Sequence, residues 1–263
     1  MDPLAPLIAS LRAEGRLRVW SLVITAFGDL VRHRGGAITT TRLNTLLGRI
    51  GVEPGALRTA LSRLDSDGWI ERERTGRTSV CRLSREGLAQ FDPATSVIYA
   101  APASSSVEEW SLSITLGEGA PTVRLVPAGS ANDKADATVT GRLDDLSPKF
   151  RAAYLEPAYR AALETLAQDL AALPQVSDPL DAAAARLLLI HRWRRIVLRF
   201  PEPLPQLLPS DAPLADPRAD VARAYAALSD PAEAWLSADC GTVPGMPPAD
   251  HAYANRFGLS AKA

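Results

Sequence analysis

The sequence predicts an α+β protein with an N-terminal winged helix-turn-helix, a short β-rich middle segment and a helical C-terminal domain. Apolar residues recur at helical spacing through most of residues 18–66. Two strand-like runs then flank a glycine turn at residues 75–77, and further short strand-like runs lie between residues 110 and 140. From residue 147 onward the periodicity is again helical.

The composition predicts a soluble, cytoplasmic protein. The 263 residues, 46% apolar and 22% charged, are sufficient for two or three globular domains. No apolar run approaches the roughly 18–20 residues that cross a bilayer, and residues 1–15 lack the layout of a signal peptide. Cys81 and Cys240 form neither a disulfide framework nor a metal-ligand spacing. We therefore expect no membrane association, no metal and no cofactor.

Charge is distributed unequally along the chain. Residues 1–90 contain 14 arginines and 9 acidic residues, a net charge of +5, whereas residues 91–263 contain 15 basic and 21 acidic residues, a net charge of −6. This asymmetry indicates that only the N-terminal part meets a polyanion. A general preference for arginine, with 26 Arg against 3 Lys, is the alternative explanation.

Five segments are expected. They are a helical arm at 1–17, a winged-helix domain at 18–91, a linker and small β-rich domain at 92–146, a helical effector and dimerisation domain at 147–240, and a tail at 241–263. Residues 92–107 are expected to be a linker with one strand at 97–100.

Four helices are expected in the N-terminal domain, the last of them at residues 85–91, where Ser84 caps it after the hairpin described below. The first spans about residues 18–31, and the second begins after the capping threonines 39–41 and ends at Gly51. The third begins at Pro54 and has one apolar face, formed by Leu57, Ala60, Leu61 and Leu64.

The opposite face of the third helix points to nucleic acid. It combines two arginines with hydroxyl residues and contains no acid: Arg58, Thr59, Ser62, Arg63 and Ser66. A helix, a short turn and such a second helix form the helix-turn-helix layout, in which the second helix enters the major groove. Arginine can make two hydrogen bonds to guanine, while Ser and Thr serve bases or phosphates.

Residues 69–74 and 78–83 flank Thr75-Gly76-Arg77 and predict a β-hairpin with a basic tip, the wing. We expect four base-reading residues: Arg58, Thr59, Ser62 and Arg63. Phosphate or minor-groove contacts are expected from six more: Thr39, Thr40, Thr41, Arg72, Arg74 and Arg77. A winged-helix protein-interaction module without its own operator is the alternative, because Arg–Glu alternation such as that at 71–74 also occurs on solvated strand faces.

Four stretches of the N-terminal domain resemble the PaaX family of bacterial repressors of phenylacetate-degradation operons. They are SLVITAFGDL (21–30), RGGAI (34–38), LRTALSRLDSDGWI (57–70) and GRTSVCRLSREGL (76–88). The resemblance resumes at HRWRRIVLRFP (191–201) and PAEAWL (231–236). It implies a repressor that binds a double-stranded DNA operator.

The resemblance also implies a ferredoxin-like middle domain whose opening strand leads into an Arg-rich helix. This sequence has that strand at 110–116, with further strands expected at 122–126 and 137–140. Residues 117–121, Gly-Glu-Gly-Ala-Pro, cannot form the helix. The middle domain is therefore expected to be abbreviated.

The C-terminal half is expected to be helical up to about residue 237. Helices are expected at 150–173 with a break at Pro157, at 178–200, at 216–228 and at 231–237, followed by loops from 238 to 263.

The helix at 178–200 contains the candidate effector residues. On a helical wheel Arg192, Arg195 and Arg199 form one stripe, while His191 and Arg194 lie within an apolar arc that includes Trp193. A cation on a buried face needs an anion, which is either an acid of another helix or a ligand. The resemblance implies phenylacetyl-CoA as inducer, with Trp193 on the acyl group and the arginine stripe on phosphates. Another acyl-CoA is the alternative.

No catalytic set is apparent. His33, His191 and His251 are scattered, and the sequence has no phosphate loop, dinucleotide fingerprint or serine elbow. We therefore expect a regulator, not an enzyme, acting as a homodimer on a palindromic operator.

Overall fold

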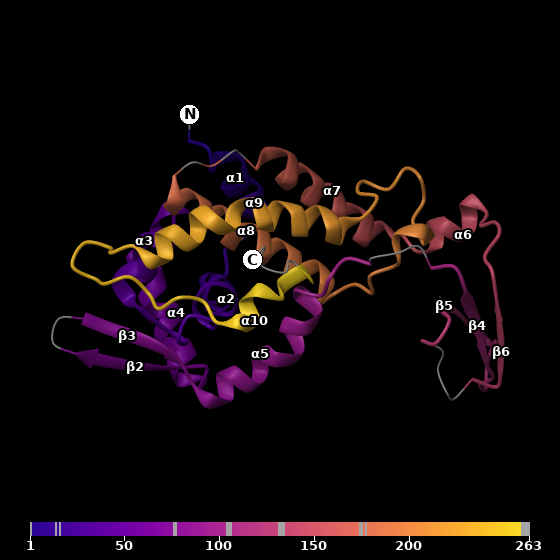
Figure 1. The fold of residues 1–263 in the computed structure, drawn as a ribbon, viewed down its shortest axis with the longest axis horizontal. Coiled ribbons are helices and arrows are strands. Elements are labelled where there is room, and N and C mark those ends of the chain that lie inside the picture. The colour runs from indigo at the N-terminus through magenta and orange to yellow at the C-terminus, as the bar shows by residue number, and fades with distance from the viewer. Residues whose placement is uncertain are drawn as a thin grey trace. The chain divides into compact units, whose positions relative to one another are not determined.

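Helices dominate the chain, and two small antiparallel sheets complete an α+β architecture (Figure 1). This computed structural model describes residues 2–13, 15, 17–75, 78–103, 107–130, 135–173, 176 and 178–258. The observed class agrees with the predicted one. Among the described residues, no helix has both the length and the apolar character that crossing a membrane requires.

The chain forms two compact units that do not follow the order of the sequence. Unit 1 contains Met1–Pro102, Pro157–Glu202 and Pro213–Ala263, and unit 2 contains Ala103–Glu156 and Pro203–Ala212. The predicted domains at 18–91 and 147–240 are therefore not separate bodies. Most of both belongs to unit 1, and the predicted domain boundaries at 91 and 146 stay a prediction.

Helix α8 (Pro179–Val197) explains why these segments form one unit. Ala182–Ala185 are fully buried, and so are most of the residues that follow, on all sides of the helix. A helix buried all round must be covered by several neighbours. Helices of the N-terminal segment and of the C-terminal half supply them. The helices that contact α8 are α1 (Ala5–Ala13), α2 (Val19–Ala26), α3 (Thr40–Arg49), α5 (Arg85–Ile98), α7 (Pro157–Ala172) and α9 (Pro217–Ser237).

The N-terminal segment has the predicted order of helices and hairpin. It contains α1 (Ala5–Ala13), α2 (Val19–Ala26) with the π-helical extension η1 (Phe27–Val31), β1 (Ala37–Thr39), α3 (Thr40–Arg49), α4 (Pro54–Ser66), β2 (Ile70–Thr75) and β3 (Thr78–Leu83). The strands form an antiparallel sheet in the order β1-β3-β2. Gly51, at φ +80°, ends the α3 region as predicted, since that conformation favours glycine.

Helix α5 (Arg85–Ile98) is longer than predicted, so the expected linker from 92 and strand at 97–100 are wrong. Pro93 lies inside the helix and removes one backbone hydrogen bond. Tertiary contacts hold this part: Arg32 donates to the Thr95 hydroxyl (2.8 Å) and pairs with Asp92, and Ile98 is buried.

The C-terminal half agrees with the prediction at one proline and differs at another. The expected break separates α6 (Pro148–Ala153) from α7 (Pro157–Ala172). By contrast, α9 (Pro217–Ser237) continues through Pro231, where two helices were expected, because Ala232 and Leu236 beyond the proline are buried. The tail, expected to be loops, contains α10 (His251–Ala254) and the 3-10 turn η3 (Arg256–Gly258).

Unit 2 contains the three predicted middle strands. β4 (Trp110–Thr115), β5 (Thr122–Pro127) and β6 (Ala137–Gly141) form an antiparallel sheet in the order β5-β4-β6, accompanied by α6 and the 3-10 turn η2 (Pro205–Leu207). Residues 116–121 contain no helix. The unit therefore lacks the strand-to-helix step of a ferredoxin-like domain, as the sequence predicts.

Candidate nucleic-acid interface

Helix α4 presents the predicted polar face to solvent. Leu57, Ala60, Leu61 and Leu64 are buried, and α4 contacts α2 and α3. The four residues predicted to read bases are all exposed: Arg58, Thr59, Ser62 and Arg63. Burial of one apolar face therefore fixes which side chains α4 offers to a partner.

Acidic residues lie closer to the polar face of α4 than predicted. Asp65 and Asp67 are both exposed, and Asp67 accepts from Arg63 at 3.4 Å. The guanidinium of Arg63 also lies 5.7 Å from the centre of the Trp20 ring. Two carboxylates thus stand near the last turn of α4, and the acid-free surface is limited to its first two turns. Arg58 and Thr59 lie on that part.

The three threonines at the start of α3 have different roles. Thr39 caps the helix, since its hydroxyl accepts from the Arg42 amide (3.2 Å). Thr40 donates to the Ser79 carbonyl (2.8 Å) and so ties α3 to β3. Thr41 is exposed at the first turn. Thr41 is thus the threonine whose side chain is most accessible to a phosphate.

The β2–β3 hairpin separates its charges. Side chains alternate between the two faces of a strand, so Arg72 and Arg74 share a face with the buried Ile70, whereas Glu71 and Glu73 lie on the other. Arg72 stands opposite the buried Cys81 in the ladder, and Glu71 stands opposite Arg82. All four side chains are exposed, so the hairpin has two solvated faces that carry opposite charge. Arg77, at the predicted tip, lies outside the described residues.

Helices α3 and α4 and the hairpin gather at one end of unit 1 (Figure 1). α3 contacts β3, and α4 contacts β2. The elements that carry the predicted base and phosphate contacts are therefore neighbours in space, as one continuous interface requires.

Comparison with known proteins assigns the chain to a family. A family model described as "PaaX-like protein" matches residues 18–87, and one described as "PaaX-like protein C-terminal domain" matches residues 150–238; together they cover more than half of the chain. The chain belongs to the PaaX-like family.

A curated protein and a solved structure are also similar to this chain. The Transcriptional repressor PaaX of Escherichia coli (strain K12) is 28% identical over 282 aligned residues, which cover 90% of this chain and 89% of that protein. The solved structure of an uncharacterized protein from Mycobacterium tuberculosis is 20% identical and covers 82% of this chain and 97% of that chain at a TM-score of 0.45. In this PaaX-like chain the first matched segment includes α3, α4 and the hairpin.

The predicted effector residues do not form one surface of the PaaX-like fold. The stripe of Arg192, Arg195 and Arg199 is divided, because Arg192 is buried and donates to Asp169 (2.7 Å), whereas the other two are exposed. Trp193 is fully buried and donates to the Ile98 carbonyl (2.9 Å). In this structure Trp193 therefore cannot pack against a ligand, which corrects the expectation.

His191 is also part of the interior. Its Nδ1 lies 2.9 Å from the Thr25 hydroxyl, which itself donates to the Ser21 carbonyl. The hydroxyl hydrogen is thereby engaged, so His191 Nδ1–H is the donor to Thr25. Burial lowers the pKa of His191 to about 3, with the cations Arg194 and Arg195 acting in the same direction. The imidazole is neutral near pH 7.

A buried ionic cluster surrounds Asp29, on η1, and was not predicted from the sequence. This carboxylate is 2% exposed and accepts from Arg186 Nε (3.1 Å), Arg256 Nη1 (2.8 Å) and the hydroxyls of Tyr99 (2.7 Å) and Tyr225 (3.1 Å). The only sign of this cluster in the sequence was the acidic Asp29 within the apolar helical pattern of residues 19–31. The cluster joins the N-terminal segment to α8, α9 and the tail.

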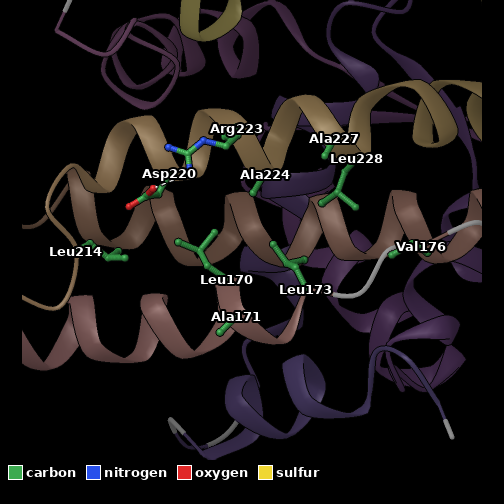
Figure 2. Close-up of a pocket in the computed structure, with 10 residues that line it drawn as sticks. All are labelled: Leu170, Ala171, Leu173, Val176, Leu214, Asp220, Arg223, Ala224, Ala227 and Leu228. Atoms are coloured by element: carbon green, nitrogen blue, oxygen red, sulfur yellow. Dashed lines mark ion pairs between the residues drawn. The ribbon is translucent and has the colours of Figure 1, made fainter.

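Figure 2 shows a large hollow between α7 and α9, of about 780 Å³. Leucines and alanines form most of its wall, and its two charged residues, Asp220 and Arg223, pair with each other at 3.1 Å. The hollow thus presents no unpaired charge to a ligand. Among the described residues, no group of three or more His, Cys, Asp or Glu side chains is placed to hold a metal ion.

Proposed function

We propose that this PaaX-like chain is a DNA-binding transcriptional repressor in which α3, α4 and the β2–β3 hairpin form a winged helix-turn-helix. The exposed first two turns of α4, with Arg58 and Thr59, are the observation that carries the proposal. They supply a bidentate donor and a hydroxyl at the N-terminal half of the helix, the part that reads base edges in this motif.

The hairpin and the relative support the same function. Arg72 and Arg74 share one strand face, away from Glu71 and Glu73, which suits a positive wing lying along the sugar-phosphate backbone. The E. coli relative is named a transcriptional repressor, and its similarity extends over 90% of this chain. An operator with two-fold symmetry, bound by a homodimer, follows from the usual match of protein and site symmetry.

We further propose that an acyl-CoA thioester, such as phenylacetyl-CoA, releases the operator. A groove of about 1080 Å³ lined by Arg18, Thr59, Arg63 and Arg195 offers cations to the phosphates of such a ligand. Thr59 and Arg63 are also proposed DNA contacts. A ligand in this groove and DNA on α4 would compete for the same side chains, so the two affinities must be reciprocally coupled.

The decisive experiment is a gel-shift titration on the DNA upstream of the chain's own gene and neighbouring operons, with and without phenylacetyl-CoA. We expect a specific shift that the thioester reverses. Arg58→Ala should weaken specific binding about tenfold or more, since a bidentate base contact contributes about 1–3 kcal/mol of discrimination. Arg223→Ala, which removes an exposed arginine from α9, is the matched control and should bind as the wild type does.

Each alternative has its own outcome. Specific binding that ignores the thioester would retain the repressor and reject this effector. Absence of any specific shift would favour the interaction module without an operator, whereas equal specific binding by wild type and Arg58→Ala would reject Arg58 as a base-reading residue.

A further inference from the structure

A second, smaller pocket lies in unit 1 beneath the DNA-facing elements. It has a volume of about 210 Å³ and is enclosed by α2, η1, α5 and α8. Four aromatic residues contribute to its wall: Trp20, Trp69, Phe91 and Tyr99. Ile24, Ala94, Ile98, Ile190 and Leu198 supply most of the remaining apolar surface. An apolar cavity of about 150 Å³ is large enough to take up benzene, so this pocket has room for one aromatic ring.

Arg194 brings a cation to this apolar wall. Its Nη2 donates to the Ser21 hydroxyl at 3.2 Å, but its Nε is buried and, among the described residues, has no hydrogen-bond partner. An unsatisfied buried donor costs free energy, and more so on a charged group. In the hollow of Figure 2, by contrast, Arg223 pairs with the carboxylate of Asp220.

The electrostatics of Arg194 agree with this geometry. Burial lowers the pKa of its guanidinium, and nearby Arg195 acts in the same direction, while Tyr99 opposes them. An oxygen acceptor placed in the pocket would satisfy the buried Nε–H and compensate the desolvated charge.

We propose that this pocket binds the aromatic acyl group of an aryl acid or of its thioester, with an acyl oxygen accepting from Arg194 Nε. The consequence of binding, release of the operator, rests on the proposed function, whereas the binding itself does not. The aromatic wall selects a flat apolar group, and Arg194 selects the oxygen at its end. The basic groove described above also contains Trp20, so the phosphates of a thioester would have cations within the same region of unit 1.

The pocket touches both elements that face DNA. Trp20 contributes to the wall and lies under the Arg63 guanidinium, 5.7 Å from ring centre to Cζ. Trp69 directly precedes β2 and meets Phe91 edge to face, with ring centres 5.7 Å apart. A ring that enters between these residues shifts Arg63 and the base of the hairpin. If the shifted arrangement binds the ligand more tightly than the DNA-competent one does, the operator is released.

The test is a titration of the full chain with phenylacetate and, separately, with phenylacetyl-CoA, followed by tryptophan fluorescence and calorimetry. Ala94→Phe fills the pocket from α5, and Arg194→Gln removes the charged donor. Each should weaken binding of the probe about tenfold or more. Val97→Phe, which adds the same ring at an exposed position of the same helix, should leave it unchanged. Should Ala94→Phe fail to fold, Arg194→Gln decides.

If either probe binds the wild type and both pocket variants weaken that binding, the site is supported. The probe that binds, phenylacetate or phenylacetyl-CoA, shows whether the ligand is the free acid or its thioester. Failure of both probes to bind wild-type protein, or equal binding by wild type and Arg194→Gln, overturns it. Operator binding without any probe is measured in parallel. If the chain binds operator but neither probe, the pocket proposal is rejected and the repressor function stands. If the chain binds a probe but no operator, the repressor function is rejected and the pocket proposal stands.

Discussion

At the scale of single residues, unit 1 depends on charges that have been removed from water. Asp29, Arg186 and Arg256 are each at most 3% exposed and lie within hydrogen-bond distance of one another through the Asp29 carboxylate. Burying such charges is costly, and the cost is offset only while every partner is present. The cluster therefore makes the association of η1 with α8 and the tail specific, because a shifted packing would leave a charge unpaired.

Asp29→Asn should lower the free energy of unfolding by about 3–5 kcal/mol, since it removes the carboxylate that pairs with the buried Arg256 and leaves the buried Arg186 with Glu233 alone. Asp220→Asn, which breaks the more exposed pair with Arg223, should cost about 1 kcal/mol or less. Urea denaturation of the three proteins measures both. Equal midpoints for the wild type and Asp29→Asn would contradict a structural role for the cluster.

His191 makes stability dependent on pH. Its pKa is about 3 in the folded chain and about 6.5 when unfolded, so between these values only the unfolded chain takes up the proton. Stability must then fall as pH drops from 6.5, by up to about 1.4 kcal/mol per pH unit. His191→Asn retains a donor for Thr25 and does not titrate. Between pH 7 and pH 5 the wild type should lose about 2 kcal/mol more than this variant, and parallel losses in urea titrations would refute the assignment.

At the scale of elements, one close approach of backbone sets how α5 meets the hairpin. Gly87 lies in the first turn of α5, which Ser84 caps by accepting from the Gly87 amide (2.8 Å). A Cβ at Gly87 would lie 2.2 Å from the Trp69 carbonyl oxygen, where it cannot be accommodated without a backbone shift. The glycine thereby lets α5 lie against the start of β2, and Trp69 reaches Phe91.

Gly87→Ala should destabilise the fold by about 1–3 kcal/mol, because the backbone must move to admit one methyl group. Gly48→Ala in α3 is the control. Nothing lies within 4 Å of a Cβ there, and alanine should stabilise the helix by about 1 kcal/mol. Thermal unfolding that moves in opposite directions for the two variants is the expected result; a Gly87→Ala protein as stable as the wild type would show that α5 is not held at this distance.

At the scale of the whole molecule, charge is distributed unequally between the two parts of the chain. The excess of arginine in residues 1–90 gives that segment a net charge of +5 in a chain whose net charge is −1. Helix α4 and the hairpin, which carry several of these arginines, lie at the same end of unit 1 (Figure 1), where a polyanion gains from them together.

Operator affinity should therefore fall steeply with salt, with a slope of log K against log salt of about −0.9 for each phosphate neutralised. Arg72→Ala should make the slope shallower by about one and weaken binding to all sequences alike. Arg58→Ala should instead reduce the preference for operator over random DNA. Anisotropy titrations between 50 and 300 mM salt distinguish the two effects, and a flat dependence would exclude backbone contacts as the source of affinity.

The sequence determined the elements whose signal is local. Periodicity and capping residues gave α3 and α4 and the polar face of α4, turn residues gave the β2–β3 hairpin, and alternation gave β4, because these features depend on neighbours a few residues away. The same local rules predicted a helix end near Pro93 and another near Pro231, and both predictions were wrong. There the burial of Ile98 and Leu236 outweighs the hydrogen bond that each proline removes.

Only the tertiary structure decided which charges are paired and which elements share a core. A helical wheel places Arg192 and Arg195 on one stripe, but it cannot show that Asp169, from another helix, buries the first. It likewise cannot show that Arg194, unlike Arg186, meets no carboxylate among the described residues. Partners distant in sequence set the burial and pairing of each side chain, since both are properties of packing. The division into two units has the same cause, for α8 needs cover on every side and the N-terminal helices provide part of it.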